Sequence, residues 1–223
     1  MKKFKVLEIK KSVFASNDKD AEELRSKLKI DHKFLLNLMS SPGSGKTTTL
    51  VQVINRLKDK VKIGVMEADI DSDVDASTIE DKTGIKVIQL HTGGMCHLDA
   101  DMTKQAMDGL GMKDIQFGIL ENVGNLVCPA EFDTGATKNA MILSIPEGDD
   151  KPLKYPLMFE ISDIVIFNKI DAMTIFDFDI KKCEERILRL NPNAKFFPIS
   201  AKTGEGVDEL ADYLFDLYKK NTL

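Results

Sequence analysis

Residues 34–48 read FLLNLMSSPGSGKTT, an apolar run followed by a glycine-rich loop. The run 34–39 predicts a buried strand, and the apolar spacing beyond it predicts a helix that opens near Thr48. A glycine-rich loop between a strand and a helix is the context of a phosphate-binding loop. Its backbone N–H groups and the helix N-terminus attract phosphate, Lys46 adds a positive charge, and Thr47 offers a hydroxyl to Mg²⁺. Ser40 stands where this pattern usually has glycine. The nucleotide contacts predicted in this loop are Gly43, Ser44, Gly45, Lys46, Thr47 and Thr48.

Further short apolar runs follow this unit and alternate with segments of helical spacing. The predicted strands are 34–39, 63–66, 87–90, 115–120, 141–145, 164–167 and 196–199. The predicted helices are 50–57, 98–110, 180–190 and 207–217. Strands that alternate with helices form a mostly parallel sheet with helices on both faces. We therefore expect an α/β fold of the P-loop NTPase type, with three layers.

The chain has 223 residues, enough for one substantial core and few for two. In an N-terminal segment, 1–32, Ala21, Leu24 and Leu28 recur at helical spacing and predict an amphipathic helix. We expect this segment to precede a single domain, 33–223, that carries the phosphate loop. The stretch 146–156, which contains proline, glycine and mixed charge, predicts a mobile loop.

Charge and hydropathy argue against several classes of partner. The formal net charge is −5, which leaves no overall positive field for a nucleic-acid backbone or an anionic membrane surface. The sequence has no apolar run of about 18 residues, the length that spans a membrane, and no signal-peptide core near its start. Three widely spaced cysteines do not make a disulfide framework. We expect a cytoplasmic protein without nucleic-acid or membrane partners, whose cysteines are thiols or metal ligands.

Two short motifs after predicted strands indicate which base the phosphate site serves. In the first motif, 168–171 (NKID), Asp171 offers a carboxylate that accepts both the N1–H and the N2–H of guanine. Adenine has an acceptor at N1 and would leave that carboxylate unpaired. In the second motif, 200–202 (SAK), the backbone can contact guanine O6 and the aliphatic stem of Lys202 can cover the ring. The guanine-binding residues predicted from the two motifs are Asn168, Lys169, Asp171, Ser200, Ala201 and Lys202.

Acidic residues at strand ends predict the magnesium shell. Glu121 ends a predicted strand where common GTPases carry aspartate, and it can still reach Mg²⁺ through water. Asp69 follows another strand and is the predicted second contact, with rivals in the same loop at Asp71, Asp73 and Asp75. Asn125 stands where many regulatory GTPases place a water-orienting glutamine, which predicts slow hydrolysis. The predicted magnesium ligands are Thr47, Asp69 and Glu121, and the predicted catalytic residues are Lys46, Asp69 and Glu121.

Cys96 and His97 join a predicted strand to a helix, and Cys128 follows the neighbouring predicted strand, 115–120. The carboxyl ends of parallel strands converge on one edge of a sheet, where these three side chains could meet. Two thiolates and an imidazole suit Zn²⁺ or Ni²⁺ and leave a position for water or for a second protomer. The same residues fit equally well two small buried cysteines and a helix-end histidine. Cys183 lies on an apolar helix stripe and is predicted to belong to the core, while His91 is a minor further candidate.

Several of these stretches resemble the HypB family of hydrogenase nickel-incorporation GTPases, from about Phe34 to the C-terminus. The motifs that carry the resemblance are 41–47 (SPGSGKT), 96–100 (CHLDA), 121–129 (ENVGNLVCP) and 147–156 (EGDDKPLKYP). The resemblance implies a SIMIBI-class GTPase that uses GTP, GDP and Mg²⁺ and forms a homodimer with GTP. It also implies that the two cysteines and the histidine above hold Ni²⁺ or Zn²⁺ at the subunit boundary. The implied partners are a HypA-type nickel metallochaperone and the large subunit of [NiFe]-hydrogenase.

The sequence departs from this family at two places. Many members carry an N-terminal Cys-x-x-Cys-Gly-Cys motif or a histidine-rich tract. The segment 1–32 of this chain contains no cysteine and a single histidine, His32. The family usually shows Gly-Asp after the second strand, where this chain has Ala68 and Asp69. Three alternatives stay open: a urease-type nickel GTPase, a P-loop small-molecule kinase, and a nucleotide-independent metal-binding scaffold. The first carries a Cys-Pro-His triplet that is absent here, and Asp171 argues against the second.

Overall fold

An entirely buried strand, β2 (Phe34–Ser40), lies inside an eight-stranded sheet whose strand order is β1-β4-β3-β5-β2-β6-β7-β8. The structure is a computed structural model that describes residues 5–8, 16–69 and 72–222. Every ladder between neighbouring strands is parallel. The other strands are β1 (Lys5–Glu8), β3 (Ile63–Asp69), β4 (Lys86–His91), β5 (Phe117–Glu121), β6 (Lys138–Ser144), β7 (Ile164–Asn168) and β8 (Lys195–Pro198).

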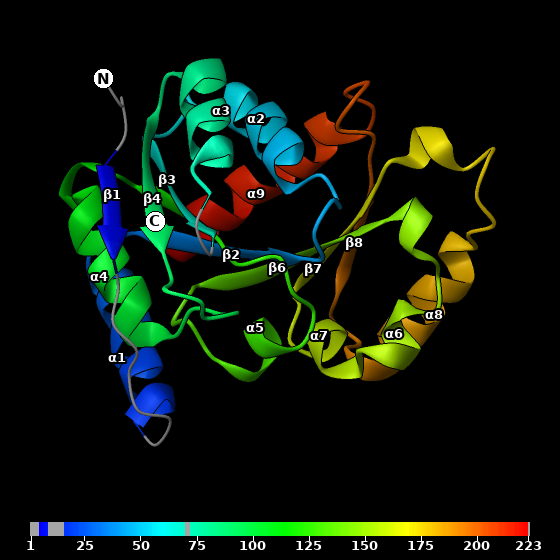
Figure 1. Cartoon of the computed structure of the whole chain (residues 1–223), viewed down its shortest axis with the longest axis horizontal. Helices are drawn as coiled ribbons and strands as arrows, with labels where there is room; N and C mark the ends of the chain where they lie inside the picture. The colour runs from blue at the N-terminus through cyan, green and yellow to red at the C-terminus, as the bar shows by residue number, and fades with distance from the viewer. Residues whose placement is uncertain (1–4, 9–15, 70–71, 223) are drawn as a thin grey trace.

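Helices cover both faces of this sheet (Figure 1). On one face, α2 (Lys46–Leu57), α3 (Val74–Thr83) and α9 (Val207–Thr222) pack on alternate residues of β2 such as Phe34, Leu36 and Leu38. On the other face, α1 (Asn17–Ile30) and α4 (Ala100–Leu110) pack on residues such as Leu35. The same face continues under α5 (Cys128–Glu131), α7 (Pro156–Glu160) and α8 (Ile180–Leu190), around Met39 and Phe167. The remaining helices are η2 (Met112–Asp114), η3 (Ile145–Glu147), α6 (Lys151–Lys154) and η4 (Ile170–Ala172). The three-layer α/β prediction is confirmed.

Each of the seven predicted strands and four predicted helices has a counterpart within a few residues of its predicted bounds. Several elements of the structure were not predicted, among them α3 and β1. The helix α3 follows the acidic loop, where the charges conceal a short apolar stripe of Ala76 and Ile79. The edge strand β1 pairs with β4, a long-range pairing that a four-residue stretch does not reveal.

The predicted amphipathic helix of the N-terminal segment is α1, which buries Ala21, Leu24 and Leu28. Leu24 and Leu28 join the same apolar cluster as α4 and the second face of the sheet. His32, just beyond α1, has a left-handed backbone and lies with its Nδ1 2.7 Å from the carbonyl oxygen of Thr222. The division of the chain at residue 33 stays a prediction, and the described part of the segment packs on the sheet.

The mobile loop predicted at 146–156 is wrong, because this stretch is built of η3, α6 and the start of α7. Proline stands in the first turn of each of these helices, where its missing N–H is not needed. The Glu147 carboxylate accepts from the N–H and the hydroxyl of Ser144 and closes the turn. Prolines that suggest a loop here act as helix starts. Among the described residues, no helix is long and apolar enough to cross a membrane.

Candidate functional site

The phosphate loop runs from the end of β2 into α2, as the sequence predicts. Gly43 and Gly45 have positive φ angles of 75° and 98°, a conformation that glycine adopts without steric cost. A Cβ at Gly45 would lie 2.5 Å from the Nδ2 of Asn168, so only glycine fits there. The hydroxyl of Ser44 donates to that of Ser40 at 2.7 Å, and both side chains are buried. The serine that replaces the usual first glycine is therefore held inside the loop by a hydrogen bond.

Asn168, in the first predicted guanine motif, contacts both the phosphate loop and the second predicted motif. Its Nδ2 donates to the carbonyl of Ser44 at 2.8 Å, and its Oδ1 accepts from the N–H of Ala201 at 3.0 Å. Lys169 has a left-handed backbone, and its Nζ donates to the carbonyl of Gly43 at 2.6 Å. These contacts bring three segments that are far apart in the sequence to one edge of the sheet.

Asp171 lies exposed at this edge, where its Oδ1 accepts from the Ser200 hydroxyl at 2.6 Å. The predicted guanine-binding residues therefore lie together, with Lys202 exposed beside them. An exposed carboxylate with one oxygen already positioned can accept two N–H groups from the edge of a base.

Three carboxyl groups gather beside the phosphate loop: those of Glu67, Asp75 and Glu121. One oxygen atom of each lies within 4.8 Å of one from each of the others. Glu67 and Glu121 are register partners on β3 and β5, so their side chains emerge side by side on the same face. Both are buried, and neither oxygen of Glu121 nor the Oε2 of Glu67 has a hydrogen-bond partner among the described residues. Buried carboxyl oxygens without partners fit a divalent cation, which prefers such ligands.

Burial dominates the electrostatics of this acidic cluster. It raises the pKa of Glu67 to about 9, and the neighbouring Glu121 carboxyl adds to the effect. Burial likewise raises the pKa of Glu121 to about 7, while the Lys46 ammonium acts in the opposite direction. Without a cation, this pair therefore holds at least one proton at neutral pH.

The predicted magnesium ligands only partly coincide with this cluster. Glu121 belongs to it, and Asp75, one of the rivals in the acidic loop, joins it from the first turn of α3. Asp69 ends β3, and its Oδ1 accepts from the N–H of Ser72 at 2.9 Å. Asp73 is the N-cap residue of α3, and Asp71 lies outside the described residues. A magnesium role for Asp69 stays a prediction.

Glu67 was missed by the sequence analysis. It stands two residues before the end of β3 and directly after the apolar run 63–66 that predicted this strand. A charged residue that continues a buried apolar run is a signal that could have pointed to it.

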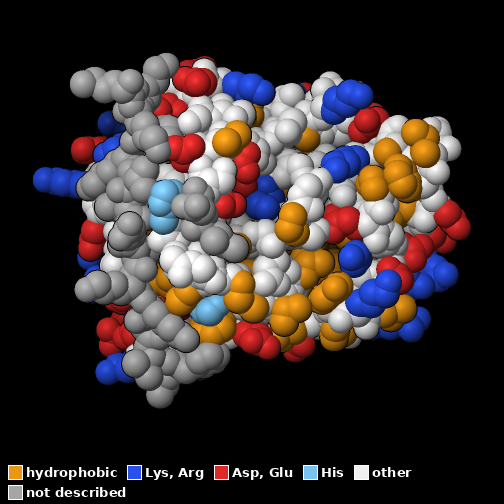
Figure 2. Space-filling model, in the orientation of Figure 1, with side chains coloured by type: hydrophobic (Ala, Val, Ile, Leu, Met, Phe, Trp, Pro, Cys, Tyr) orange, Lys and Arg blue, Asp and Glu red, His pale blue; other side chains and the backbone are white. Residues whose placement is uncertain are grey.

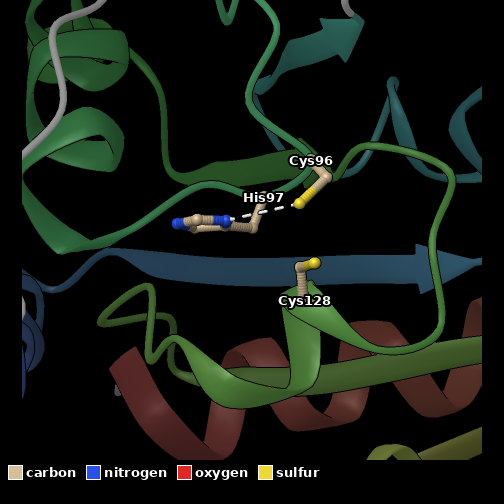
Figure 3. Close-up of side chains that lie close together, drawn as sticks. All are labelled: Cys96, His97 and Cys128. Atoms are coloured by element: carbon tan, nitrogen blue, oxygen red, sulfur yellow. Dashed lines mark hydrogen bonds between the residues drawn. The ribbon is translucent and has the colours of Figure 1, made fainter.

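The second candidate site joins the segments that follow β4 and β5, two strands that are separated in the sheet by β3. Cys96 and His97 lie between β4 and α4, and Cys128 is the first residue of α5 (Figure 3). One ligand atom of each lies within 4.8 Å of those of the other two. The Sγ of Cys96 lies 3.9 Å from the Nδ1 of His97. The structure thus brings together the three residues predicted to bind Ni²⁺ or Zn²⁺.

The two thiols of this cluster interact directly. A hydrogen bond with Cys128, followed by burial, raises the pKa of the Cys96 thiol. Both cysteines are half-buried, whereas the imidazole of His97 is buried and stacks on Phe132, with ring centroids 3.5 Å apart. An incoming metal ion must displace thiol protons, so its binding is coupled to pH.

The remaining cysteine and histidines lie elsewhere. Cys183 is fully buried on α8, and burial raises its pKa to about 12. It packs in the apolar cluster around Phe167, which confirms its predicted place in the core. His91 is the last residue of β4, outside both groups of possible metal ligands found among the described residues.

One short segment connects the two candidate sites. It leaves β5 at Glu121, passes Gly124 and reaches Cys128. A Cβ at Gly124 would lie 3.2–3.4 Å from atoms of Pro42 in the phosphate loop, so the segment passes close to that loop. The buried side chain of Asn122 anchors its start by donating to the Oδ1 of Asn37 on β2 at 3.2 Å.

This fold, with its phosphate loop and the two predicted guanine motifs at strand ends, is that of the P-loop GTPase class. A model of the nucleotide-binding domain of CobW, HypB and UreG matches residues 34–198. The hydrogenase maturation factor HypB of Rhizobium leguminosarum bv. viciae is 42% identical over 96% of this chain and 71% of its own length. The hydrogenase/urease maturation factor HypB of Helicobacter hepaticus is 41% identical over 94% of this chain and 87% of its own length.

A solved structure agrees with these relatives. The crystal structure of HypB from Helicobacter pylori in complex with nickel superposes with a TM-score of 0.86 and 39% identity, covering 93% of this chain and 97% of that one. The chain therefore belongs to the CobW/HypB/UreG family and, within it, to the HypB hydrogenase maturation factors. The resemblance inferred from the motifs is confirmed.

Proposed function

We propose that this protein binds and hydrolyses GTP and assists nickel insertion during the maturation of [NiFe]-hydrogenase, with dimerisation linked to GTP and metal. The observation that carries the proposal is the segment from Glu121 to Cys128. It begins in the acidic cluster, passes the phosphate loop and ends in the thiol and imidazole cluster. A change at the γ-phosphate can therefore reach a metal ligand through a few residues of backbone.

The nucleotide half of the proposal assigns a task to each group. The N–H groups of the phosphate loop and Lys46 hold the β- and γ-phosphates, and Asp171 accepts two N–H groups of guanine. Thr47 and Glu121, with the predicted Asp69 and with Asp75 and Glu67 nearby, would hold Mg²⁺. A cation held there would supply positive charge to offset the negative charge that develops on the phosphate groups. Asn125 stands where many regulatory GTPases place a water-orienting glutamine, in keeping with slow intrinsic hydrolysis.

In the metal-binding part of the proposal, the ion is a cargo that the protein passes on. Two thiolates and an imidazole suit Ni²⁺ or Zn²⁺ and leave a coordination position for a ligand from water, a second protomer or a partner. The nickel complex of the Helicobacter pylori relative supports Ni²⁺ as that cargo. We propose a HypA-type metallochaperone as donor and the hydrogenase large subunit as recipient. The name of the Helicobacter hepaticus relative favours a second recipient, urease.

Surface chemistry beside the metal cluster supports a homodimer. Figure 2 shows apolar side chains gathered over the part of this face where α5, α6 and α7 lie. Val127, Leu153 and Leu157 belong to these elements or precede them directly, and between two-fifths and two-thirds of each is exposed. Exposed apolar side chains that cluster in this way mark contact sites. A partner subunit seated there would lie next to Cys128.

Two experiments test the proposal. Competition binding of GTP against ATP should favour GTP strongly, and Asp171→Asn should abolish that preference. Size-exclusion chromatography with light scattering should give a monomer with GDP and a dimer with a non-hydrolysable GTP analogue, with Ni²⁺ or Zn²⁺ shifting the balance in wild type and not in Cys96→Ala. Equal affinity for ATP would refute the GTPase assignment, and metal-independent behaviour in wild type would refute the link between nucleotide and metal.

A further inference from the structure

The first residue of α1, Asn17, lies between the two segments that carry the metal ligands. Its Oδ1 accepts from the N–H of Ala100 at 2.9 Å, and its Nδ2 donates to the carbonyl of Asp133 at 3.0 Å. The partners fix the orientation of the amide, because a backbone N–H only donates and a carbonyl only accepts. Asn17 is 3% exposed, so both hydrogen bonds are sheltered from water.

These two partners belong to opposite halves of the metal cluster. Ala100 opens α4 and stands three residues after His97. Asp133 directly follows Phe132, the residue on whose ring the His97 imidazole stacks. One amide side chain thus bridges the segment that carries Cys96 and His97 and the segment that begins at Cys128.

The rest of α1 holds the second segment in place. Arg25 donates to both carboxylate oxygens of Asp133 at 2.7 and 2.8 Å, and its Nε donates to the carbonyl of Ala136 at 3.0 Å. Gly135 has a φ of 74°, and a Cβ there would lie 2.9–3.0 Å from atoms of Leu24 and Ala21. The chain after α5 is therefore in direct contact with α1, with no room for a larger residue.

Metal coordination is sensitive to such support. Ligand distances must be met within about 0.2 Å, and removing a hydrogen bond that orients ligands typically costs about 10–100-fold in metal affinity. Here Cys96 and His97 lie in the segment before α4, and Cys128 opens α5, so the separation of the ligands depends on the contacts that join these two segments.

We propose that Asn17 is a positioning residue of the Cys96, His97 and Cys128 site. Its amide sets the distance between the two ligand-bearing segments, and α1 is thereby part of the metal site. This inference rests on the proposed metal binding. It assigns a role in the site to a helix that the sequence analysis placed in a separate N-terminal segment.

The test is a metal titration of the full chain with Co²⁺, whose thiolate charge-transfer absorption reports cysteine ligands, and with Ni²⁺ against a chromophoric chelator. Asn17→Ala removes both hydrogen bonds. Asn17→Asp keeps the acceptor for Ala100 but offers nothing to the carbonyl of Asp133. The matched control is Asn191→Ala, because Asn191 also accepts from one backbone N–H and donates to one carbonyl, at 3.0 and 2.9 Å, beyond the end of α8.

We expect about 10–100-fold weaker metal binding in both Asn17 variants, unchanged GTP affinity, and wild-type metal binding in Asn191→Ala. Wild-type metal affinity in Asn17→Ala would overturn the inference, as would an equal loss in Asn191→Ala, which would indicate general destabilisation. If Asn17→Ala does not fold, Asn17→Asp decides by the same criteria. Failure of the metal site itself has a different signature: wild type would show no thiolate absorption, or Cys96→Ala and Cys128→Ala would retain it.

Discussion

Replacing Glu67 by glutamine should stabilise the protein when no nucleotide or metal is bound. Glu67 is 3% exposed, its Oε2 has no hydrogen-bond partner among the described residues, and Glu121 is its register partner on β5. Burial and that neighbour raise its pKa to about 9. The folded protein thus keeps a proton that the unfolded chain releases near pH 4.5. The contribution of Glu67 to the free energy of unfolding is therefore highest below that pH and falls as the pH rises towards 9.

The size of the effect follows from the two pKa values. Each pH unit above 4.5 costs about 1.4 kcal/mol for one retained proton, which gives an upper limit of about 3.5 kcal/mol at pH 7. Local relaxation and entry of water reduce this to about 2 kcal/mol. For a chain of this length, that difference shifts the melting temperature by about 4–8 °C. Glutamine keeps the shape of the side chain and never ionises, so Glu67→Gln recovers this free energy at pH 7 and little of it at pH 5.

Urea unfolding of the nucleotide-free protein at pH 5, 6, 7 and 8 measures the effect. Glu209→Gln on the exposed side of α9 controls for the change in net charge. Mg²⁺ with GDP should stabilise wild type more at pH 8 than at pH 6, because the cation then binds the ionised pair. The reasoning is wrong if Glu67→Gln and wild type have equal stability at pH 8. It is also wrong if the difference in stability between them is as large at pH 5 as at pH 8.

Three further predictions follow from single contacts. Gly45→Ala places a Cβ about 2.5 Å from the Nδ2 of Asn168, so GTP affinity measured by calorimetry should fall at least about tenfold; wild-type affinity would contradict the tight fit. Arg186→Ala leaves the largely buried Asp149 carboxylate without the guanidinium 2.7 Å away and should cost about 1–3 kcal/mol of unfolding free energy; an unchanged urea midpoint would show that water replaces the pair. Cys183→Ser should leave the Co²⁺ thiolate spectrum unchanged, since this thiol lies in the core, and a weaker spectrum would mean that the cysteine reaches the metal.

Most of the fold and the nucleotide-binding motifs could be predicted from local sequence. A phosphate loop is one contiguous stretch whose glycines, lysine and threonine act together with the adjacent backbone. Its chemistry can therefore be predicted from the order of its residues. The alternation of apolar runs with helical spacing likewise follows from which faces each element must bury. The stretch 146–156 shows where this reasoning fails, because proline starts a helix as readily as it breaks one.

The contacts that bind separate segments were decided by tertiary structure alone. Glu67 stands beside Glu121 because β3 and β5 pair in one register, and no local pattern specifies the partner of a strand. Asn168 and Asn17 each bridge segments far apart in the chain, and an asparagine looks the same in a sequence whether it faces water or two backbone groups. By itself the sequence determined the kind of chemistry at each site, since that depends on residue type. Which side chains meet there depends on packing, and packing exists only in the folded chain.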